Sequence, residues 1–193
     1  MAKLEPPALL EKASEVIRSV DPGALIETIE FRDEVTLVVD KRPIVAIIRA
    51  LREKPELRFD FLSDITAIDY LEMERDPRFD VVYHLFSLEH HHRLRLRAPV
   101  EEAEAQCRID TITGLWTTAN YHEREVYDMY GIRFDGHPDL RRILMPENWK
   151  GHPLRKDFPI GGSTSFYFKQ DTDEYAGEPE DLVPRIHVQD SDV

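Results

Sequence analysis

The residues best suited to chemistry stand close together: the carboxylates Glu123, Glu125 and Asp128, with Arg124 among them. Closely spaced carboxylates can serve as the general acid and base of an enzyme. On a helix, however, Arg124 lies one turn before Asp128 and is placed to pair with it. We therefore expect an ion-paired structural network here in preference to a catalytic carboxylate pair.

Histidines and the single cysteine offer a second kind of chemistry, metal binding. His122 and Glu123 begin like a helical zinc motif, but Val126 stands where that motif requires its second histidine. The remaining candidate ligands are His84, His90, His91, His92, His137 and His152. They lack the spacing of a zinc site, so a self-contained metal enzyme is the weaker alternative. Cys107 stands alone, which excludes an internal disulfide and a cluster bound by about four cysteines.

Sequence motifs for cofactors and nucleophiles are missing as well. No glycine cluster matches a dinucleotide fingerprint or a phosphate-binding loop, so we expect no NADH or nucleotide site in this chain. No Gly-x-Ser-x-Gly turn marks a nucleophilic serine. The formal net charge of −13 opposes binding to nucleic acid and to an anionic membrane surface.

The apolar pattern bears on localisation. No apolar run reaches the roughly 18 to 20 residues that cross a bilayer, and residues 1–7 lack the apolar block of a signal peptide. We expect a protein of the cytoplasm, or of a cytoplasmic membrane surface where other proteins hold it, without direct membrane insertion.

Hydrophobic periodicity predicts an α+β domain over residues 1–132, with a mixed or antiparallel sheet flanked by helices. The predicted helices span residues 8–20, 43–53 and 112–130, and Gly131 is placed to end the last one. The predicted strands span residues 24–31, 35–40, 59–70, 79–86 and 93–98. We expect the last three strands to form an antiparallel meander, with 79–86 central because it is apolar on much of both faces.

Arginines alternate along the last of these strands, where Arg93, Arg95 and Arg97 share one face. This alternation is the clearest period-2 signal in the chain. A solvated face explains the row better than a stripe that docks a partner, which stays the second interpretation.

Beyond Gly131 the periodicity ends, and composition predicts an extended arm (residues 133–170) and an acidic tail (residues 171–193). One further strand is expected over residues 163–169. The arm mixes basic side chains with apolar anchors, as protein interfaces do, so partner binding is favoured over a strap that contacts only its own domain. The residues in question are Arg141, Arg142, Arg155 and Lys156, with Leu140, Ile143, Leu144, Met145, Trp149, Leu154 and Phe158.

The junction of helix and arm resembles the signature of a known family, the C subunit of the proton-pumping NADH:quinone oxidoreductase, respiratory complex I (the 30 kDa subunit family). The similarity extends over most of residues 60–160, and we find no departure from the pattern within the signature. The matching residues are Glu123-Arg124-Glu125, Asp128-Met129-Tyr130, His137, Arg141 and Ile143-Leu144.

The resemblance implies a subunit of the hydrophilic arm of complex I, which passes electrons from NADH through FMN and iron–sulfur clusters to quinone, coupled to proton translocation. In that family the subunit is an α/β domain without a cofactor of its own, and the FMN and clusters belong to partner subunits. Its C-terminal arm wraps the quinone-site D subunit and lies close to the B and I subunits. The implied location is the cytoplasmic side of the bacterial inner membrane, as a peripheral protein. The alternative is the equivalent subunit of a related membrane-bound hydrogenase or quinone-linked dehydrogenase complex.

The roles predicted for individual residues are structural. We expect Glu123, Arg124, Glu125 and Asp128 to fix the last helix and its junction with the arm. The residues expected to dock on the partner are His137, Arg141, Arg142, Trp149, His152, Arg155, Lys156 and Phe158. We expect no catalytic, cofactor-binding or metal-binding residue in this chain.

Overall fold

The computed structural model describes residues 4–73 and 75–158 with their side chains, and four short strands beyond them. These strands are β8 (Ile160–Gly161), β9 (Tyr167–Lys169), β10 (Glu174–Ala176) and β11 (Leu182–Val183). They form two antiparallel pairs, β8 with β11 and β9 with β10. β9 is the last part of the strand expected over residues 163–169, whose first part lies outside the described residues, as does most of the predicted acidic tail.

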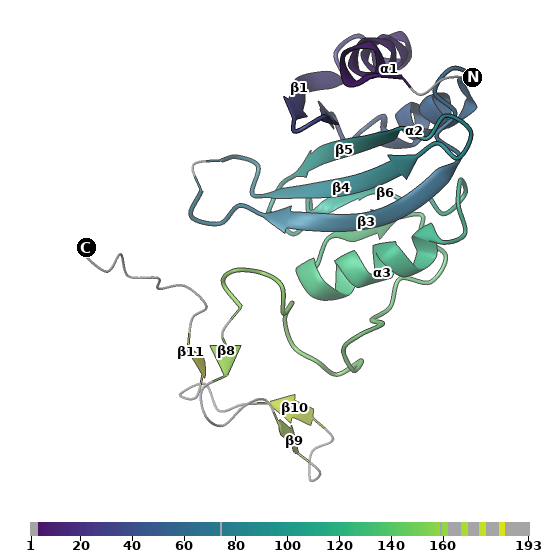
Figure 1. The fold of residues 1–193 in the computed structure, drawn as a ribbon. Coiled ribbons are helices and arrows are strands. Elements are labelled where there is room, and N and C mark those ends of the chain that lie inside the picture. Colours follow the sequence, from purple (N-terminus) through teal and green to yellow (C-terminus); the bar gives the residue numbers. More distant parts are fainter. Residues whose placement is uncertain are drawn as a thin grey trace.

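A five-stranded mixed sheet forms the centre of the fold (Figure 1). Its strands are β1 (Leu25–Phe31), β2 (Glu34–Val39), β3 (Phe61–Asp69), β4 (Phe79–Phe86) and β5 (Arg93–Val100). They lie in the order β1-β2-β5-β4-β3, and all neighbours are antiparallel except β2 and β5. The predicted sheet type is confirmed, as is the antiparallel meander of β3, β4 and β5 with β4 inside the sheet.

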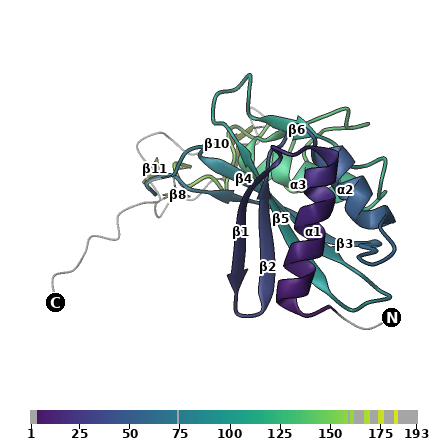
Figure 2. The ribbon, with the colours of Figure 1, turned by 90° about the horizontal axis from the view of Figure 1, so that it is seen from above.

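Helices α1 (Pro6–Val20) and α2 (Ile44–Glu53) lie side by side over one face of this sheet (Figures 1 and 2). Both spans agree with the predicted helices, because each helix turns a single apolar stripe toward the sheet. The buried stripe of α2 consists of Ile44, Ile47, Ile48 and Leu51.

Helix α3 (Ala119–Tyr130) runs along β3, at the edge of the sheet opposite β1 (Figure 1). Its buried residues Ala119 and Val126 belong to the same hydrophobic core as the residues of α1 and α2. Gly131 follows the helix with φ 77°, the left-handed conformation predicted for this position.

The predicted start of this helix at residue 112 is wrong, because the residues before Ala119 form turns. The carboxylate of Glu123 accepts hydrogen bonds from the hydroxyl of Thr111 (2.5 Å) and the amide of Ile112 (2.8 Å). This segment therefore bonds to a side chain where a helix would bond to its own backbone. Ile112 is buried nevertheless. An apolar residue therefore stands where the buried stripe of a longer helix would require one.

Two short strands that were not predicted flank α3. β6 (Arg108–Asp110) and β7 (Arg133–Asp135) pair in parallel, so that β6, α3 and β7 form a β-α-β unit. Each strand has three residues, too few for a period-2 pattern to be recognised in the sequence. β7 begins directly after residue 132, where we had expected the compact domain to end.

The arginine row of β5 lies on the sheet face opposite α1 and α2. Arg97 is 13% exposed and pairs with the buried carboxylate of Asp80 at 2.7 Å, and Arg95 pairs with Glu34 at 2.6 Å. Arg93 is exposed. The prediction of a solvated face is therefore correct for Arg93 and wrong for Arg97, because a buried aspartate requires a counter-charge beside it.

Candidate functional site

The buried carboxylate of Asp128, near the end of α3, is the centre of the junction between helix and arm. Its Oδ2 accepts hydrogen bonds from the amides of Ile143, Leu144 and Met145 at 3.0, 2.8 and 2.8 Å. Its Oδ1 accepts one from Nη1 of Arg142 at 2.6 Å. Burial alone would raise the pKa of Asp128, but these donors hold it below its ordinary value. The carboxylate is therefore a structural anchor for the arm.

Arg124 binds the same part of the arm, although not as predicted. Its guanidinium donates hydrogen bonds to the carbonyls of Arg141 and Arg142 at 3.1 and 3.0 Å. The predicted ion pair between Arg124 and Asp128 is wrong, since Asp128 is buried beneath the arm and pairs with Arg142 there. Arg124 supplies donors that backbone carbonyls outside regular structure require. Glu125, by contrast, is exposed.

A second turn of the arm packs against the C-terminus of α3. Nδ1 of His152 donates to the carbonyl of Asp128 at 3.0 Å, and Nε of Arg155 donates to the carbonyl of Tyr130 at 2.5 Å. Carbonyls at a helix end lack partners within the helix, so the arm satisfies them. This approach requires Gly131, because a Cβ there would lie 2.6 Å from Nε2 of His152. Burial lowers the pKa of His152, which favours the neutral ring.

A second anchor, not predicted from the sequence, joins the arm to the hairpin of β3 and β4. Arg78, which is 7% exposed, donates two hydrogen bonds of 2.8 Å to the carboxylate of Asp69. The same guanidinium contacts Asp157 of the arm at 2.8 Å, and the amide of Lys156 donates to Asp69 at 2.9 Å. Nothing in the local spacing of these residues links Arg78 with Asp157.

Glu123 and His137 are buried near each other, with Nε2 of His137 4.0 Å from the Glu123 carboxylate. Burial raises the pKa of Glu123 to about 7, despite its hydrogen bonds to the turn before α3. Nδ1 of His137 accepts the amide of Asp139 at 3.0 Å, which assigns the proton to Nε2, the donor to the carbonyl of Asn120 at 3.2 Å. Both groups thus bond to nearby backbone, which is a structural arrangement.

The other residues with predicted docking roles also contact the chain itself. Trp149 and Phe158 stack with ring centroids 6.3 Å apart, and Arg141 pairs with Asp139 at 2.9 Å. The structure therefore brings most of the predicted site residues together around the end of α3. Apolar side chains of the same arm point outward: the exposed fractions of Ile143, Leu144 and Leu154 are 36%, 58% and 42%.

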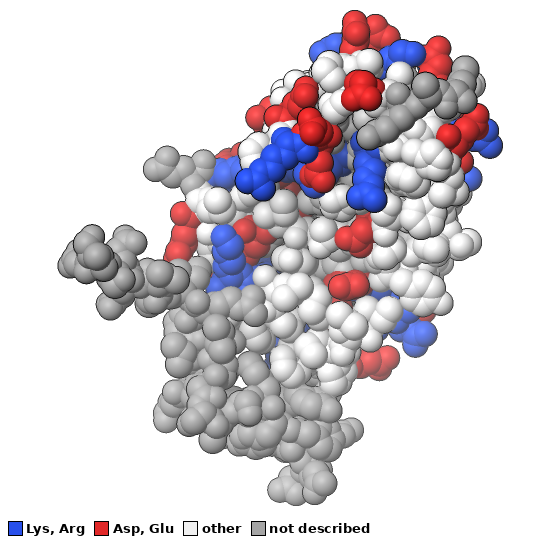
Figure 3. Space-filling model, in the orientation of Figure 1, with Lys and Arg blue, Asp and Glu red and all other residues white. Residues whose placement is uncertain are grey.

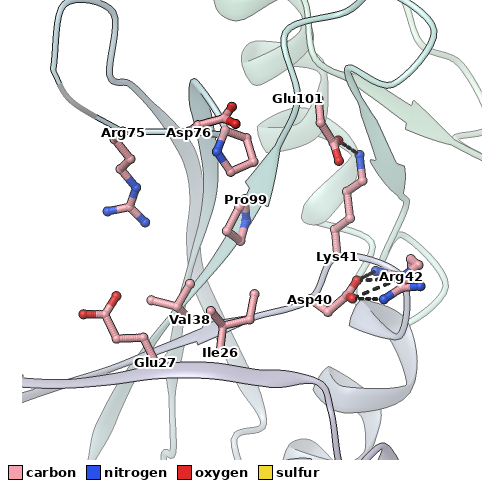
Figure 4. Close-up of a pocket in the computed structure, with 11 residues that line it drawn as sticks. Ile26, Glu27, Val38, Asp40, Lys41, Arg42, Arg75, Asp76, Pro99 and Glu101 are labelled. Atoms are coloured by element: carbon pink, nitrogen blue, oxygen red, sulfur yellow. Dashed lines mark hydrogen bonds and ion pairs between the residues drawn. The ribbon is translucent and has the colours of Figure 1, made fainter.

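A hollow of about 610 Å³ lies apart from this junction, between β1, β2 and the loop before β4 (Figure 4). Charged side chains pair at its rim, Lys41 with Glu101 and Asp40 with Arg42. No serine, cysteine or histidine is among the described residues that line it. Over residues 4–73 and 75–158, no three His, Cys, Asp or Glu side chains are placed to bind a metal ion.

Fold and site together define a class of protein: an α+β domain whose last helix binds a long arm, with apolar side chains on the outer surface of that arm. In the described part of the chain no helix is long and apolar enough to span a membrane. Exposed apolar groups on a rigid segment mark surfaces that contact other proteins. This is the construction of a protein that works as part of a larger assembly.

Comparison with known proteins identifies the family. Residues 37–164 match the family of the 30 kDa subunit of respiratory-chain NADH dehydrogenase. The C subunit of NADH-quinone oxidoreductase from Geotalea uraniireducens is 53% identical over 146 residues, which is 76% of this chain and 85% of that protein. The corresponding C subunit from a Roseiflexus species is 48% identical over 166 residues, covering 86% and 92%. The chain belongs to this family.

Solved structures agree with the fold. A trypsin-resistant fragment of Nqo5 is 35% identical and superposes with a TM-score of 0.54 over 68% of this chain and 99% of the fragment. A chain of an archaeal membrane-bound sulfane sulfur reductase superposes with a TM-score of 0.62 over 86% of this chain and 98% of that chain. At 23% identity the second likeness shows the fold alone.

Proposed function

We propose that this chain is a cofactor-free assembly subunit of NADH:quinone oxidoreductase, whose arm docks on the quinone-site D subunit and lies near the B and I subunits. In this proposal the neighbouring subunits carry the FMN and iron–sulfur clusters that pass electrons from NADH to quinone, coupled to proton translocation. The chain is peripheral, on the cytoplasmic side of the bacterial inner membrane. Its own residues perform no step of the electron transfer.

One observation carries the proposal: the arm is bonded along its inner side and apolar along its outer side. Asp128 and Arg124 form hydrogen bonds with the backbone of the arm, and Arg78 pairs with its Asp157. The side chains of Leu144 and Leu154 stay exposed. A segment without helix or strand keeps such side chains in water at a cost of about 25 cal/mol per Å² of apolar area. Docking on a partner removes that cost.

The surface beside the arm has a similar character. In the view of Figure 3, uncharged side chains dominate the surface over α3, whereas Lys and Arg mix with Asp and Glu farther up. Depletion of charge is the compositional mark of the centre of an interface. We therefore include α3 and the arm in one docking surface.

The proposal also divides the chain into a compact domain (residues 1–132), an arm (133–170) and an acidic tail (171–193), with β7 at the start of the arm paired to β6 of the domain. The Nqo5 fragment supports this division, because a trypsin-resistant piece corresponds to 68% of this chain. A domain that resists protease is one that folds without the segment that was removed.

The test uses the intact complex, purified through a tag on another of its subunits. Leu144→Asp and Leu154→Asp place charges on the outer side of the arm without touching its inner hydrogen bonds, so we expect at least about tenfold less of this chain to co-purify. Ile26→Asp, at an equally exposed apolar position on β1, the strand farthest from β3 and α3, is the matched control and should co-purify normally. Normal recovery of both leucine variants would contradict the docking role.

Arg142 is unsuitable for that test, although it was among the predicted docking residues. Its guanidinium bonds to Asp128 and to the carbonyl of Gly151, so its substitution disturbs the shape of the arm itself. The same purification tests the alternative complexes. They would be favoured if hydrogenase subunits co-purify, or if the purified complex shows no NADH-dependent quinone reduction. The sulfane reductase likeness does not favour them, because it shows the fold alone.

A further inference from the structure

One face of the central sheet stays open in the described part of the chain. α1 and α2 cover the opposite face, and α3 lies along the β3 edge (Figures 1 and 2). The main hydrophobic core accordingly contains Leu37 and Tyr83 but leaves out their neighbours Val38 and Val82, whose side chains point to the open face. Long side chains of β5 cover the middle of that face, where Arg97 pairs with Asp80.

The strand register places a row of residues straight across one end of the open face. We call it the aromatic row, and its members are Phe61, Phe86, Arg93, Glu34 and Phe31, on β3, β4, β5, β2 and β1. Direct cross-strand pairs link the first three. Thr36 pairs with Arg95, which sets Glu34 beside Arg93, and Phe31 pairs with Glu34 across the first hairpin. Four strand spacings make the row about 19 Å long.

The row presents aromatic rings, the cation of Arg93 and the carboxylate of Glu34 to the solvent, and the guanidinium of Arg32 lies 5.0 Å from the ring centroid of Phe31. Phe31 is 64% exposed and Phe61 is 47% exposed. The guanidinium of Arg93 lies 5.7 Å from the ring centroid of Phe86 and has no carboxylate partner among the described residues. Glu34 does not neutralise it, because Glu34 pairs with Arg95. Exposed aromatic residues around an arginine are the composition of interface hot spots.

We propose that the aromatic row is a second docking surface, occupied by another protein of the complex through a carboxylate flanked by apolar side chains. Charge complementarity selects this occupant, because Arg93 is an unpaired cation on a chain whose net charge is −13. The same net charge disfavours a second copy of this chain and an anionic membrane. A carboxylate over Arg93 would bind between the rings of Phe61 and Phe31.

This surface differs from the one formed by the arm. The arm reaches the sheet at Asp69 and Arg78, where β3 ends and β4 begins. The aromatic row crosses the opposite ends of the same strands, at Phe61 and Phe86, about 26 Å away along β3. The aromatic row is therefore separate from the arm, although the start of α3 reaches β3 at Asp64, 3.3 Å from His122. The inference rests on the proposed function only in that both place the chain in the complex.

The test is photo-cross-linking in the intact complex. A photoreactive residue replaces Phe61, Phe31 or, for the arm, Leu144, and the cross-linked chains are identified by mass spectrometry. We expect positions 61 and 31 to cross-link to another protein of the complex. Arg93→Glu should reduce the yield at position 61 by at least about tenfold, the effect of an interface hot spot. Arg49→Glu, an exposed arginine on α2, is the matched control and should leave the yield unchanged.

Several outcomes would overturn the inference. Cross-links at position 144 without any at positions 61 and 31 would refute the aromatic row as an interface while leaving the role of the arm intact. Absence of cross-links at all three positions would refute both. Cross-links to a second copy of this chain, or flotation of the isolated chain with anionic vesicles that Arg93→Glu abolishes, would assign the row to a different occupant.

Discussion

The substitution Asp128→Asn tests whether one buried carboxylate fixes the arm. Asparagine has nearly the same shape, but it carries no charge and replaces one acceptor oxygen with a donor NH₂ group. Arg142 would lose its ion-pair partner while remaining 14% exposed. If the NH₂ group took the Oδ2 position, it would face the three amides that now donate to that oxygen.

The expected magnitude follows from these contacts. Removing one partner of a buried ion pair costs about 3–5 kcal/mol, and we use the lower end because the arm is on the surface. At 1.4 kcal/mol for each factor of ten, about 3 kcal/mol raises the population of the released arm about a hundredfold. The carboxylate has a lowered pKa, so its contribution is complete above the ordinary value of 3.8 and disappears as the pH falls through the lowered value.

Limited trypsin digestion of the isolated chain measures this population. When the arm opens and closes faster than it is cut, the cleavage rate follows the open fraction. We expect Asp128→Asn to be cut near Arg142 and Arg155 about a hundredfold faster than the unchanged chain at neutral pH. Glu125→Gln makes the same chemical change at an exposed position of α3 and should have no effect. An acceleration below about tenfold, or equal in both variants, would refute the anchoring role of Asp128.

Three further substitutions test other parts of the junction. Burial raises the pKa of Glu123 to about 7, so folding stability should fall by about 3 kcal/mol as the pH rises from 4.5 to 7, because only the unfolded chain loses this proton there. In urea titrations at several pH values, the stability of Glu123→Gln should not fall over this range. A fall that persists in this variant would have to come from another titratable group. Gly131→Ala and Gly136→Ala both place alanine at positive φ, at about 1–2 kcal/mol each. Gly131→Ala should cost more, since its Cβ also meets the arm, and equal losses in thermal unfolding would refute the close contact. Arg78→Gln should destabilise by about 3 kcal/mol and the surface substitution Arg58→Gln by less than about 1 kcal/mol, and similar urea midpoints would contradict the buried anchor.

Most of the fold could be predicted from the sequence because its elements have strong local patterns. α2 shows its buried stripe at helical spacing, and β5 alternates arginine with apolar residues. The short strands β6 and β7 and the start of α3 could not be predicted, because no local pattern specifies them. The turn before Ala119 depends on Glu123, a residue in the helix that follows.

The structure gathers most of the predicted site residues at the junction of helix and arm, but the predicted contacts between them were wrong. Helical spacing suggested that Arg124 would pair with Asp128, since those positions are neighbours on an isolated helix. In the folded chain the arm lies over Asp128, and its amides compete for the same carboxylate. The pair of Arg78 and Asp157 joins residues 79 positions apart, so only the folded structure reveals it.

The intramolecular bonds of the arm and its proposed role in assembly are compatible, because ordering a chain segment is costly. Fixing one residue costs about 1–2 kcal/mol of backbone entropy, and a free arm would lose this entropy when it docks. The anchors at Asp128 and Arg78 hold the arm in one shape before any partner arrives. In the proposed docking, binding energy from Leu144 and Leu154 would then go into affinity, as in other preorganised binding segments. Asp128 would thus strengthen docking without touching the partner, and Asp128→Asn should weaken co-purification even though the outer surface of the arm is unchanged.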